Sequence, residues 1–185
     1  MTRPIDALHR PARAVETIVF GGLLAGILDI ADAFIVTTIN GGTPTRVLQA
    51  IASGVLGRDA YQGGAAAAAL GLALHFVIAL GAASAFLVIS RLFPAVLRYA
   101  VWSGIAFGLA VWAFMYYTVL PITFSRPNVL PAWPLLLNQL AIHAFGVGLP
   151  IALVARRSTR RGVTPIGSIE MTASGSSHEA TASLR

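Results

Sequence analysis

Residues 15–39 read VETIVFGGLLAGILDIADAFIVTTI, a largely apolar run that is interrupted in its second half by Asp29 and Asp32. A helix needs about 20 apolar residues to cross a hydrocarbon core of about 30 Å, and this run meets that length. It is longer than the roughly 7–15 apolar residues of a signal peptide, and no small-x-small cleavage site follows promptly. We therefore predict a retained, membrane-spanning helix.

Three further apolar runs are long enough to cross a membrane, at residues 65–89, 95–120 and 135–155. Of the 185 residues, 56% are hydrophobic and 11% are charged, and the mean hydropathy is +0.76. A soluble domain is about one quarter charged, so an ordinary soluble globular protein is excluded. The predicted fold class is all-α: a polytopic membrane protein with a bundle of four transmembrane helices over residues 15–155.

The basic residues of the chain are all arginines, and they gather on one side of the predicted spans. That side carries Arg3, Arg10, Arg13, Arg91, Arg98, Arg156, Arg157, Arg160 and Arg161, whereas the other carries Arg46, Arg58 and Arg126. Cytoplasmic flanks of membrane helices collect Lys and Arg, so we predict that both termini are cytoplasmic. Residues 1–14 are then a short cytoplasmic segment, and the Ser/Thr/Gly/Ala-rich residues 156–185 a disordered cytoplasmic tail.

The composition also bears on location and partners. Richness in Ala and Arg without Lys is typical of a GC-rich bacterial genome, which predicts a bacterial plasma (inner) membrane. The lipid bilayer is the predicted partner, and a second copy of the chain or another membrane subunit remains open. The pI near 11.1 does not indicate nucleic-acid binding, because the arginines flank apolar runs and form no basic face. The absence of cysteine excludes disulfides, thiolate metal sites and thiol catalysis.

Both predicted outer loops have recognisable sequence signals. In the first, residues 40–64, Thr43 is a helix cap and Pro44 suits the first helical position. One face then carries Val47, Leu48, Ile51 and Val55, while Arg46, Gln49 and Ser53 point elsewhere. We predict a short amphipathic helix on the outer interface that ends near Gly54 or Gly57, with a lid or re-entrant element over a central cavity as the alternative. The second loop, residues 121–134, is proline-rich and is predicted to be extended and stiff.

Ionisable and amide side chains lie inside the predicted spans at Asp29, Asp32, His75, His143 and Gln139. A carboxylate near the bilayer centre costs about 2.5–3.5 kcal/mol on insertion scales, so these residues are expected to face the bundle interior. With a helical rise of about 1.5 Å per residue, Asp29 and both histidines lie about 3 Å from their span midpoints, and Asp32 lies about 7.5 Å away. The sequence thus predicts a buried Asp/His layer in which Asp29 and His75 share a network and Gln139 lies one turn before His143.

Three interpretations of this layer remain open. Carboxylates beside imidazoles transfer or store protons, which favours proton- or ion-linked transport. The same contacts also suit a non-catalytic membrane subunit or scaffold in which they only fix helix packing. No cofactor is predicted outright, although imidazoles and carboxylates are ligands of divalent metals, and His75 and His143 would suit bis-histidine haem ligation. An enzyme is not predicted, because no G-x-S-x-G, H-E-x-x-H, Walker A or dinucleotide motif occurs.

Small residues recur at four-residue spacing in three of the predicted spans. The pairs are Gly22 and Gly26, Gly104 and Gly108, and Ala144 and Gly148. This spacing lets membrane helices approach closely and gain dispersion contacts. It predicts a compact bundle without specifying a dimer, since a chain rich in Ala and Gly produces such pairs by composition.

Three segments carry a family resemblance: GLLAGILDI at residues 22–30, RVLQAIASG at residues 46–54 with the Gly57 and Ala60 that follow, and GLALHF at residues 71–76. Over residues 15–120 the chain resembles small bacterial inner-membrane proteins of the YagU type, a group without an assigned activity. The resemblance implies a four-helix membrane fold. It draws attention to Asp29, residues 49–54 and His75, and it implies no catalytic role for them.

Overall fold

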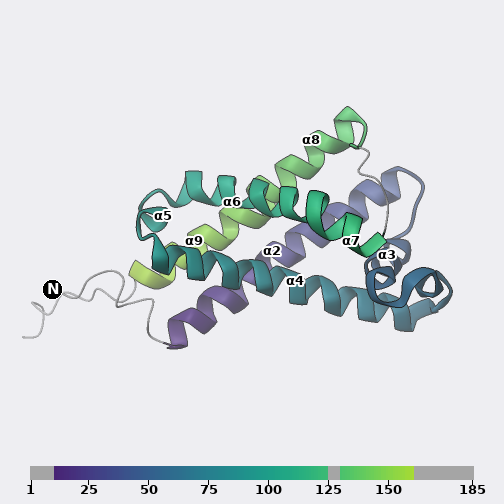
Figure 1. Ribbon diagram of the computed structural model, residues 1–185, viewed down its shortest axis with the longest axis horizontal. Coiled ribbons are helices and arrows are strands. Elements are labelled where there is room, and N and C mark those ends of the chain that lie inside the picture. Colours follow the sequence, from purple (N-terminus) through teal and green to yellow (C-terminus); the bar gives the residue numbers. More distant parts are fainter. Residues whose placement is uncertain (1–10, 125–129, 161–185) are drawn as a thin grey trace, which may run out of the picture.

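Four long helical segments make up most of the chain (Figure 1). The computed structural model describes residues 11–124 and 130–160, which form helices and short connections with no strand among them. Four segments are long and apolar enough to cross a membrane: Ala14–Ile39, Gly64–Leu92, Ala100–Thr123 and Trp133–Thr159. The predicted all-α, four-span fold class is confirmed.

The first two spans are single helices, and the last two are composite. The first is α2 (Pro11–Ile39) and the second is α4 (Gly64–Leu92). The third comprises α6 (Ala100–Phe114), the π-helical η2 (Met115–Val119) and α7 (Leu120–Phe124). The fourth comprises α8 (Trp133–Ala141), the π-helical η3 (Ile142–Gly148) and α9 (Leu149–Arg160). The connections contain α3 (Pro44–Leu56), the 3-10 helix η1 (Gly57–Gln62) and α5 (Ala95–Arg98), so the third span begins at Ala100 rather than at residue 95.

Each π-helical segment ends two residues before a proline. Pro121 follows η2, and Pro150 follows η3. Proline has no N–H for the carbonyl four residues earlier, and local π adjustment is one way in which a membrane helix accommodates that loss. Residues 121–124 therefore continue the third span as α7, whereas the sequence predicted an extended loop from residue 121. Residues 125–129 of that loop lie outside the described residues.

Glycine-mediated backbone contacts hold the spans together. α2 packs on α4 and also on η3 and α9, while α6 packs on η3 and α9. A Cβ on Gly22 would lie 3.0 Å from the Cα of Leu80 in α4. Between α6 and η3 the backbones are closer still, because a Cβ on Gly108 would overlap the carbonyl oxygen of His143. The predicted close approach at these glycines is confirmed.

The interior of the bundle is made mainly of small side chains, with Phe86 and Ile151 as large buried exceptions, and most other large side chains face outward. The main buried cluster contains Ala25, Ala83, Phe86, Ala100, Val147, Ile151, Ala152 and Ala155. Large apolar residues on the spans are exposed instead, as at Val77 (64%) and Phe20 (63%). In a membrane these side chains contact lipid, while small residues permit close helix contacts. This distribution agrees with an integral membrane protein.

Helix α3 forms as the sequence predicts. The Thr43 side chain accepts a hydrogen bond from the Arg46 N–H at 3.3 Å, and Pro44 occupies the first turn. Gly57 ends the helix with φ 64°, a left-handed conformation that glycine adopts without steric cost.

Helix α3 does not lie across the end of the bundle, because it packs along another helix. Its buried residues are Gln49, Ala52 and Ser53, and Ala52 packs in a small cluster with Ala60 and Ala67. A Cβ on Gly71 would overlap the carbonyl oxygen of Leu48, so the two backbones touch about 10 Å along α4 from its first residue. α3 thus lies beside the first turns of α4 (Figure 1).

Both terminal spans extend beyond their predicted limits. α2 begins at Pro11 rather than residue 15, and α9 continues past residue 155 to Arg160. A buried hydrogen bond of 2.8 Å between the hydroxyls of Thr17 and Ser158 joins these two helices. The remainder of the predicted cytoplasmic segments, residues 1–10 and 161–185, lies outside the described residues. The start of α2 and the end of α9 lie at the same end of the bundle as α5, which we call the α5 end. We call the opposite end the α3 end.

Candidate functional site

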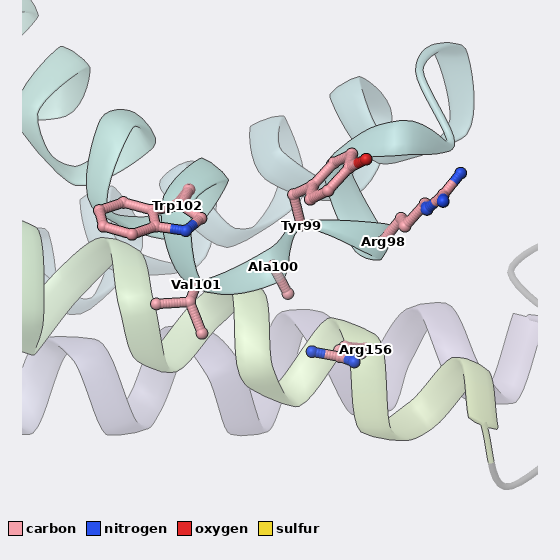
Figure 2. A pocket seen from close by; sticks show the side chains of 6 residues that line it. All are labelled: Arg98, Tyr99, Ala100, Val101, Trp102 and Arg156. Carbon is pink, nitrogen blue, oxygen red and sulfur yellow. The ribbon is translucent and has the colours of Figure 1, made fainter.

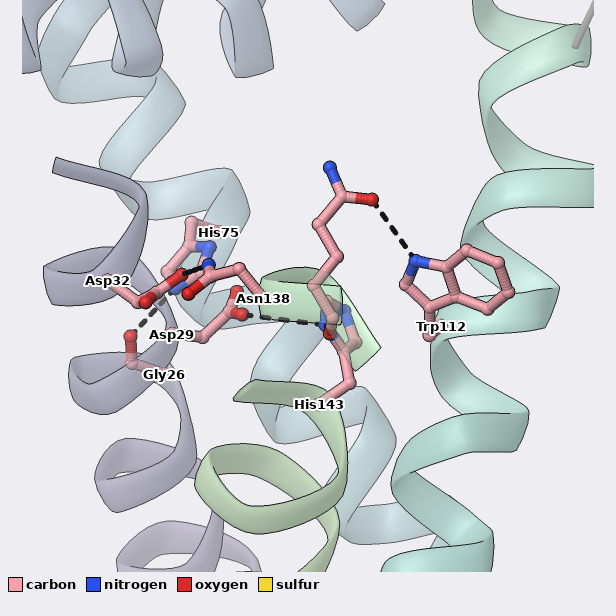
Figure 3. Close-up of polar contacts among 8 residues, drawn as sticks. Gly26, Asp29, Asp32, His75, Trp112, Asn138 and His143 are labelled. Carbon is pink, nitrogen blue, oxygen red and sulfur yellow. Dashed lines mark hydrogen bonds and ion pairs between the residues drawn. The ribbon is translucent and has the colours of Figure 1, made fainter. Parts of the chain in front are cut away.

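The two aspartates of α2 both face the fourth span (Figure 3). They lie three residues apart, which places them on one side of the helix. Asp32 accepts a hydrogen bond of 2.8 Å from the side-chain amide of Asn138 in α8, donated by Nδ2 to Oδ2. A hydrogen bond to a carboxylate is charge-assisted, so it joins α2 and α8 more strongly than one between neutral groups.

Asp29 contacts the imidazole of His143, which lies about one helical turn after Asn138 in the fourth span. Its Oδ1 lies 4.0 Å from Nδ1 of His143 in η3. The same nitrogen lies 2.9 Å from the carbonyl oxygen of Gln139, to which it donates a hydrogen bond. At 4.0 Å the contact with Asp29 is electrostatic rather than a hydrogen bond, so its strength depends on whether His143 is charged.

Gln139 extends the polar contacts to the third span. Its Oε1 accepts a hydrogen bond of 3.3 Å from Nε1 of Trp112 in α6. Trp112 in turn stacks on Tyr116, with ring centroids 5.2 Å apart and an interplanar angle of 13°. The backbone of Gln139 therefore holds His143 while its side chain contacts α6.

His75 lies apart from this cluster. Its Nε2 donates a hydrogen bond of 2.9 Å to the backbone carbonyl of Gly26 in α2. No hydrogen bond or ion pair joins His75 to Asp29, although the structure describes both side chains. The sequence predicts an Asp29–His75 network, but in the structure Asp29 contacts His143 instead.

The polar side chains are half-buried rather than enclosed. The side chains of Asp29 and His143 are 27% and 18% exposed, and Asp32 and His75 fall in the same intermediate range. The structure therefore does not show the buried Asp/His layer that the sequence predicts. It shows a cluster at the contact of three spans, made of Asp29, Asp32, Asn138, Gln139, His143 and Trp112, which we call the Asp–His cluster.

The ionisable groups of the Asp–His cluster are two carboxylates and one imidazole. Within residues 11–124 and 130–160, no group of three or more His, Cys, Asp or Glu side chains is arranged to hold a metal. The bound Nε2 of His75 also argues against the bis-histidine haem arrangement. Two carboxylates and one imidazole that bridge two spans are groups that accept and release protons.

Two members of the cluster, Asn138 and Trp112, were not predicted as site residues. Asn138 is an amide in an apolar run, one residue before Gln139, and its polarity was a usable signal. Trp112 carries no comparable signal, because a tryptophan in an apolar span is typical of packing and of the membrane interface. Its role depends on the contact between α6 and α8, which no spacing within either helix reveals.

The predicted polar residues of α3 have packing roles. Nε2 of Gln49 donates a hydrogen bond of 3.3 Å to the carbonyl of Gly64, and the Ser53 hydroxyl donates to the Ala50 carbonyl at 2.7 Å. The Arg46 guanidinium lies 4.3 Å above the ring of Tyr61. These contacts fix α3 and η1 against the start of α4.

The sequence-based resemblance to the YagU-type group stays a prediction. Comparison with models of protein families, with curated proteins and with solved structures finds no match to this chain.

Proposed function

We propose that this chain is an integral membrane protein that moves protons through the Asp–His cluster as part of proton-linked transport. The observation that carries the proposal is the 4.0 Å approach of Asp29 to His143 across the contact between the first and fourth spans. Ionisable side chains inside membrane spans are costly and mark proton or ion pathways more often than they decorate a helix.

The order of the two carboxylates along α2 supports this proposal. A proton-exchanging group must be reached by water or by another proton carrier, and a second carboxylate lies one helical turn from Asp29. Asp32 lies three residues nearer the α3 end, or about 4.5 Å along the helix, and is held by Asn138. The two carboxylates therefore form a short series from the α3 end toward His143.

Protonation of His143 would change a contact between spans. A charged imidazole attracts the carboxylate of Asp29, whereas a neutral one does not. His143 lies in η3, the π-helical part of the fourth span, where the backbone hydrogen bonds depart from the α-helical pattern. π-helical segments are frequent at functional sites, although Pro150 also accounts for this one. Coupling of a proton to a helix movement would act through this contact.

A second candidate function is a scaffold or subunit in which the polar groups only fix the packing of the spans. It is favoured by the bonds from Asn138 to Asp32 and from His75 to the Gly26 carbonyl, each of which joins two helices. It does not account for the ionisable character of Asp29, because a neutral side chain would pack there without the cost of a charge inside a span.

The same proposal includes the location. Arg91, Arg98, Arg156 and Arg157 all lie at the α5 end of the bundle. An arginine-rich side is typical of the cytoplasmic face, which supports a bacterial plasma membrane location with the α5 end and both termini inside. The resemblance to YagU-type inner-membrane proteins is consistent with that location.

Proton uptake into proteoliposomes tests the proposed function. The purified chain is reconstituted with a trapped pH-sensitive dye, and a potassium diffusion potential drives protons inward. We expect uptake above that of protein-free vesicles, and an initial rate lowered by about tenfold or more in Asp29→Asn and in His143→Gln, because each loses a proton-exchanging group. Asp59→Asn, which removes an exposed acid on η1, is the matched control and should retain the wild-type rate.

Two results would contradict proton transport. One is wild-type uptake equal to that of protein-free vesicles. The other is equal uptake by the wild type and by Asp29→Asn. If either is accompanied by a loss of thermal stability in Asp29→Asn, the scaffold function is supported instead.

A further inference from the structure

A pocket of about 190 Å³ opens at the α5 end of the bundle, and none of its lining residues belongs to the Asp–His cluster. It lies between the first turn of α6 and the last turns of α9, as Figure 2 shows. Its lining residues are Arg98, Tyr99, Ala100, Val101, Trp102 and Arg156. Two separate helices thus contribute one guanidinium each.

The pocket is positively charged. Neither an Asp nor a Glu is among its six lining residues, so Arg98 and Arg156 give it two positive charges. Tyr99 is the N-cap of the 15-residue helix α6, and no side chain caps that helix. The N-terminal end of a helix carries a partial positive charge, which adds to that of the arginines.

The backbone on the α5 side of the pocket is held in place. The Ser103 hydroxyl lies 2.5 Å from the carbonyl oxygen of Val96 and 2.8 Å from that of Tyr99, so it ties α6 to the preceding turn. The Arg98 guanidinium lies 5.4 Å from the ring centroid of Tyr99, within the range of a cation–π contact. A pocket with a fixed rim loses less conformational entropy when it binds a ligand.

Aromatic residues place the pocket at a membrane–water interface. Trp102 is 74% exposed and Tyr99 is 57% exposed. Exposed Trp and Tyr at the ends of membrane helices lie at the level of the lipid headgroups. The pocket is therefore at the depth where lipid phosphates lie.

We propose that this pocket binds a phosphate group, carried by an anionic phospholipid of the leaflet at the α5 end. Figure 2 shows the Arg98 and Arg156 guanidiniums pointing away from one another, so they favour an anionic headgroup over a zwitterionic one through their summed charge and do not clasp a single phosphate from both sides. The pocket volume of about 190 Å³ is well above the roughly 10–15 Å³ that a single water needs, so a headgroup phosphate fits. The acyl chains would continue along the exposed apolar surface near Val101.

Native mass spectrometry of the full chain in nonionic detergent tests this proposal. The protein is titrated with phosphatidylglycerol and, separately, with phosphatidylcholine of the same acyl chains. We expect preferential retention of phosphatidylglycerol. The double variant Arg98→Gln/Arg156→Gln should bind it roughly 30-fold more weakly, while phosphatidylcholine, which has a phosphate but no net charge, should lose much less affinity.

Three further arms make the result specific. Arg157→Gln removes an exposed arginine of the same helix outside the pocket and should bind phosphatidylglycerol like the wild type. Arg98→Lys/Arg156→Lys keeps the charge and should regain part of the affinity lost in the double Gln variant. Displacement of the lipid by millimolar glycerol phosphate would support the phosphate site and assign it to a soluble phosphate compound.

The proposal is overturned if the wild type binds the two lipids equally, or if the double Gln variant retains phosphatidylglycerol as the wild type does. Helix content by circular dichroism and a single elution peak are measured for each variant. A variant that fails to fold is replaced by Arg98→Gln alone, because Arg98 is exposed. That variant should still weaken the lipid preference.

Discussion

The carboxylate of Asp29 faces His143 of the neighbouring helix, and this contact decides how the residue tolerates a membrane span. At 4.0 Å the two side chains attract each other only when both are charged. His75 has a different role, because its Nε2 is bonded to the Gly26 carbonyl. At the scale of single residues, the two histidines are therefore not equivalent, although both lie at similar predicted depths.

A pair of double-mutant cycles separates the two histidines. We expect Asp29→Asn and His143→Leu to be coupled by about 0.6 kcal/mol, the average for polar contacts between membrane helices, and by no more than about 1.7 kcal/mol. Asp29→Asn and His75→Leu should be additive within about 0.5 kcal/mol. The free energy of unfolding in mixed detergent measures both cycles. Stronger coupling to His75 than to His143 would show that the pairing is wrong.

Helix contacts in this bundle depend on glycines that leave no room for a side chain. Gly108 of α6 faces the backbone of η3, whereas Gly81 of α4 has no atom within 4 Å of the position of a Cβ. The same substitution at these two glycines therefore separates backbone contact from helix propensity.

Gly108→Ala is expected to lower the free energy of unfolding by about 1–3 kcal/mol or more, because the Cβ overlaps the His143 carbonyl and must separate α6 from η3. Gly81→Ala should be neutral or stabilising by up to about 1 kcal/mol, since alanine favours the helix and meets no neighbour. Thermal unfolding in detergent compares the two variants. Equal effects at both positions would contradict the packing described for α6.

Element packing also shows what the sequence could and could not predict. The limits of a single helix could be predicted from the sequence: Thr43, Pro44 and Gly57 delimit α3 as predicted. The face by which α3 packs could not be predicted, because Gln49, Ala52 and Ser53 turn inward and the apolar Val55 turns outward. In water the apolar face would be buried, but in a bilayer lipid covers it. Which side of a helix packs depends on its neighbours.

The contacts within the Asp–His cluster likewise depend on neighbouring helices and could not be predicted from single helices. Asp29, Asp32 and His143 were identified because charge inside an apolar run is rare. Their pairing depends on how α2 sits against α8 and η3, a relation between segments about 100 residues apart in the sequence. The similar depths of Asp29 and His75 along their helices predicted a contact between them. In the structure His75 is bonded to the Gly26 carbonyl instead. Pro121 and Pro150 were visible, yet the π-helical turns before them change the rotation of each span in a way that an ideal helical wheel omits.

At the scale of the whole molecule, the arrangement of arginines and loops makes a prediction about orientation. With the α5 end cytoplasmic, α3 and η1 face the outside, and the turn at α5 faces the inside. The chain has no cysteine, so single cysteines report accessibility without background. Ser53 and Ser158 are unsuitable positions, because they are 7% and 1% exposed and would be protected on either side.

Gln62 and Ala95 are exposed, and they lie at opposite ends of the bundle. In intact cells we expect Gln62→Cys to react with a membrane-impermeant maleimide and Ala95→Cys to react only after the membrane is permeabilised, because the reagent reaches only the outer face. Val55→Cys, on the exposed side of α3, should react more slowly than Gln62→Cys if lipid covers that face, although both are open in the isolated protein. Labelling of Ala95→Cys but not Gln62→Cys from outside would invert the topology and place the arginine-lined pocket in the outer leaflet. Equal rates at Val55→Cys and Gln62→Cys would place α3 in water and remove the physical reason for its outward apolar face.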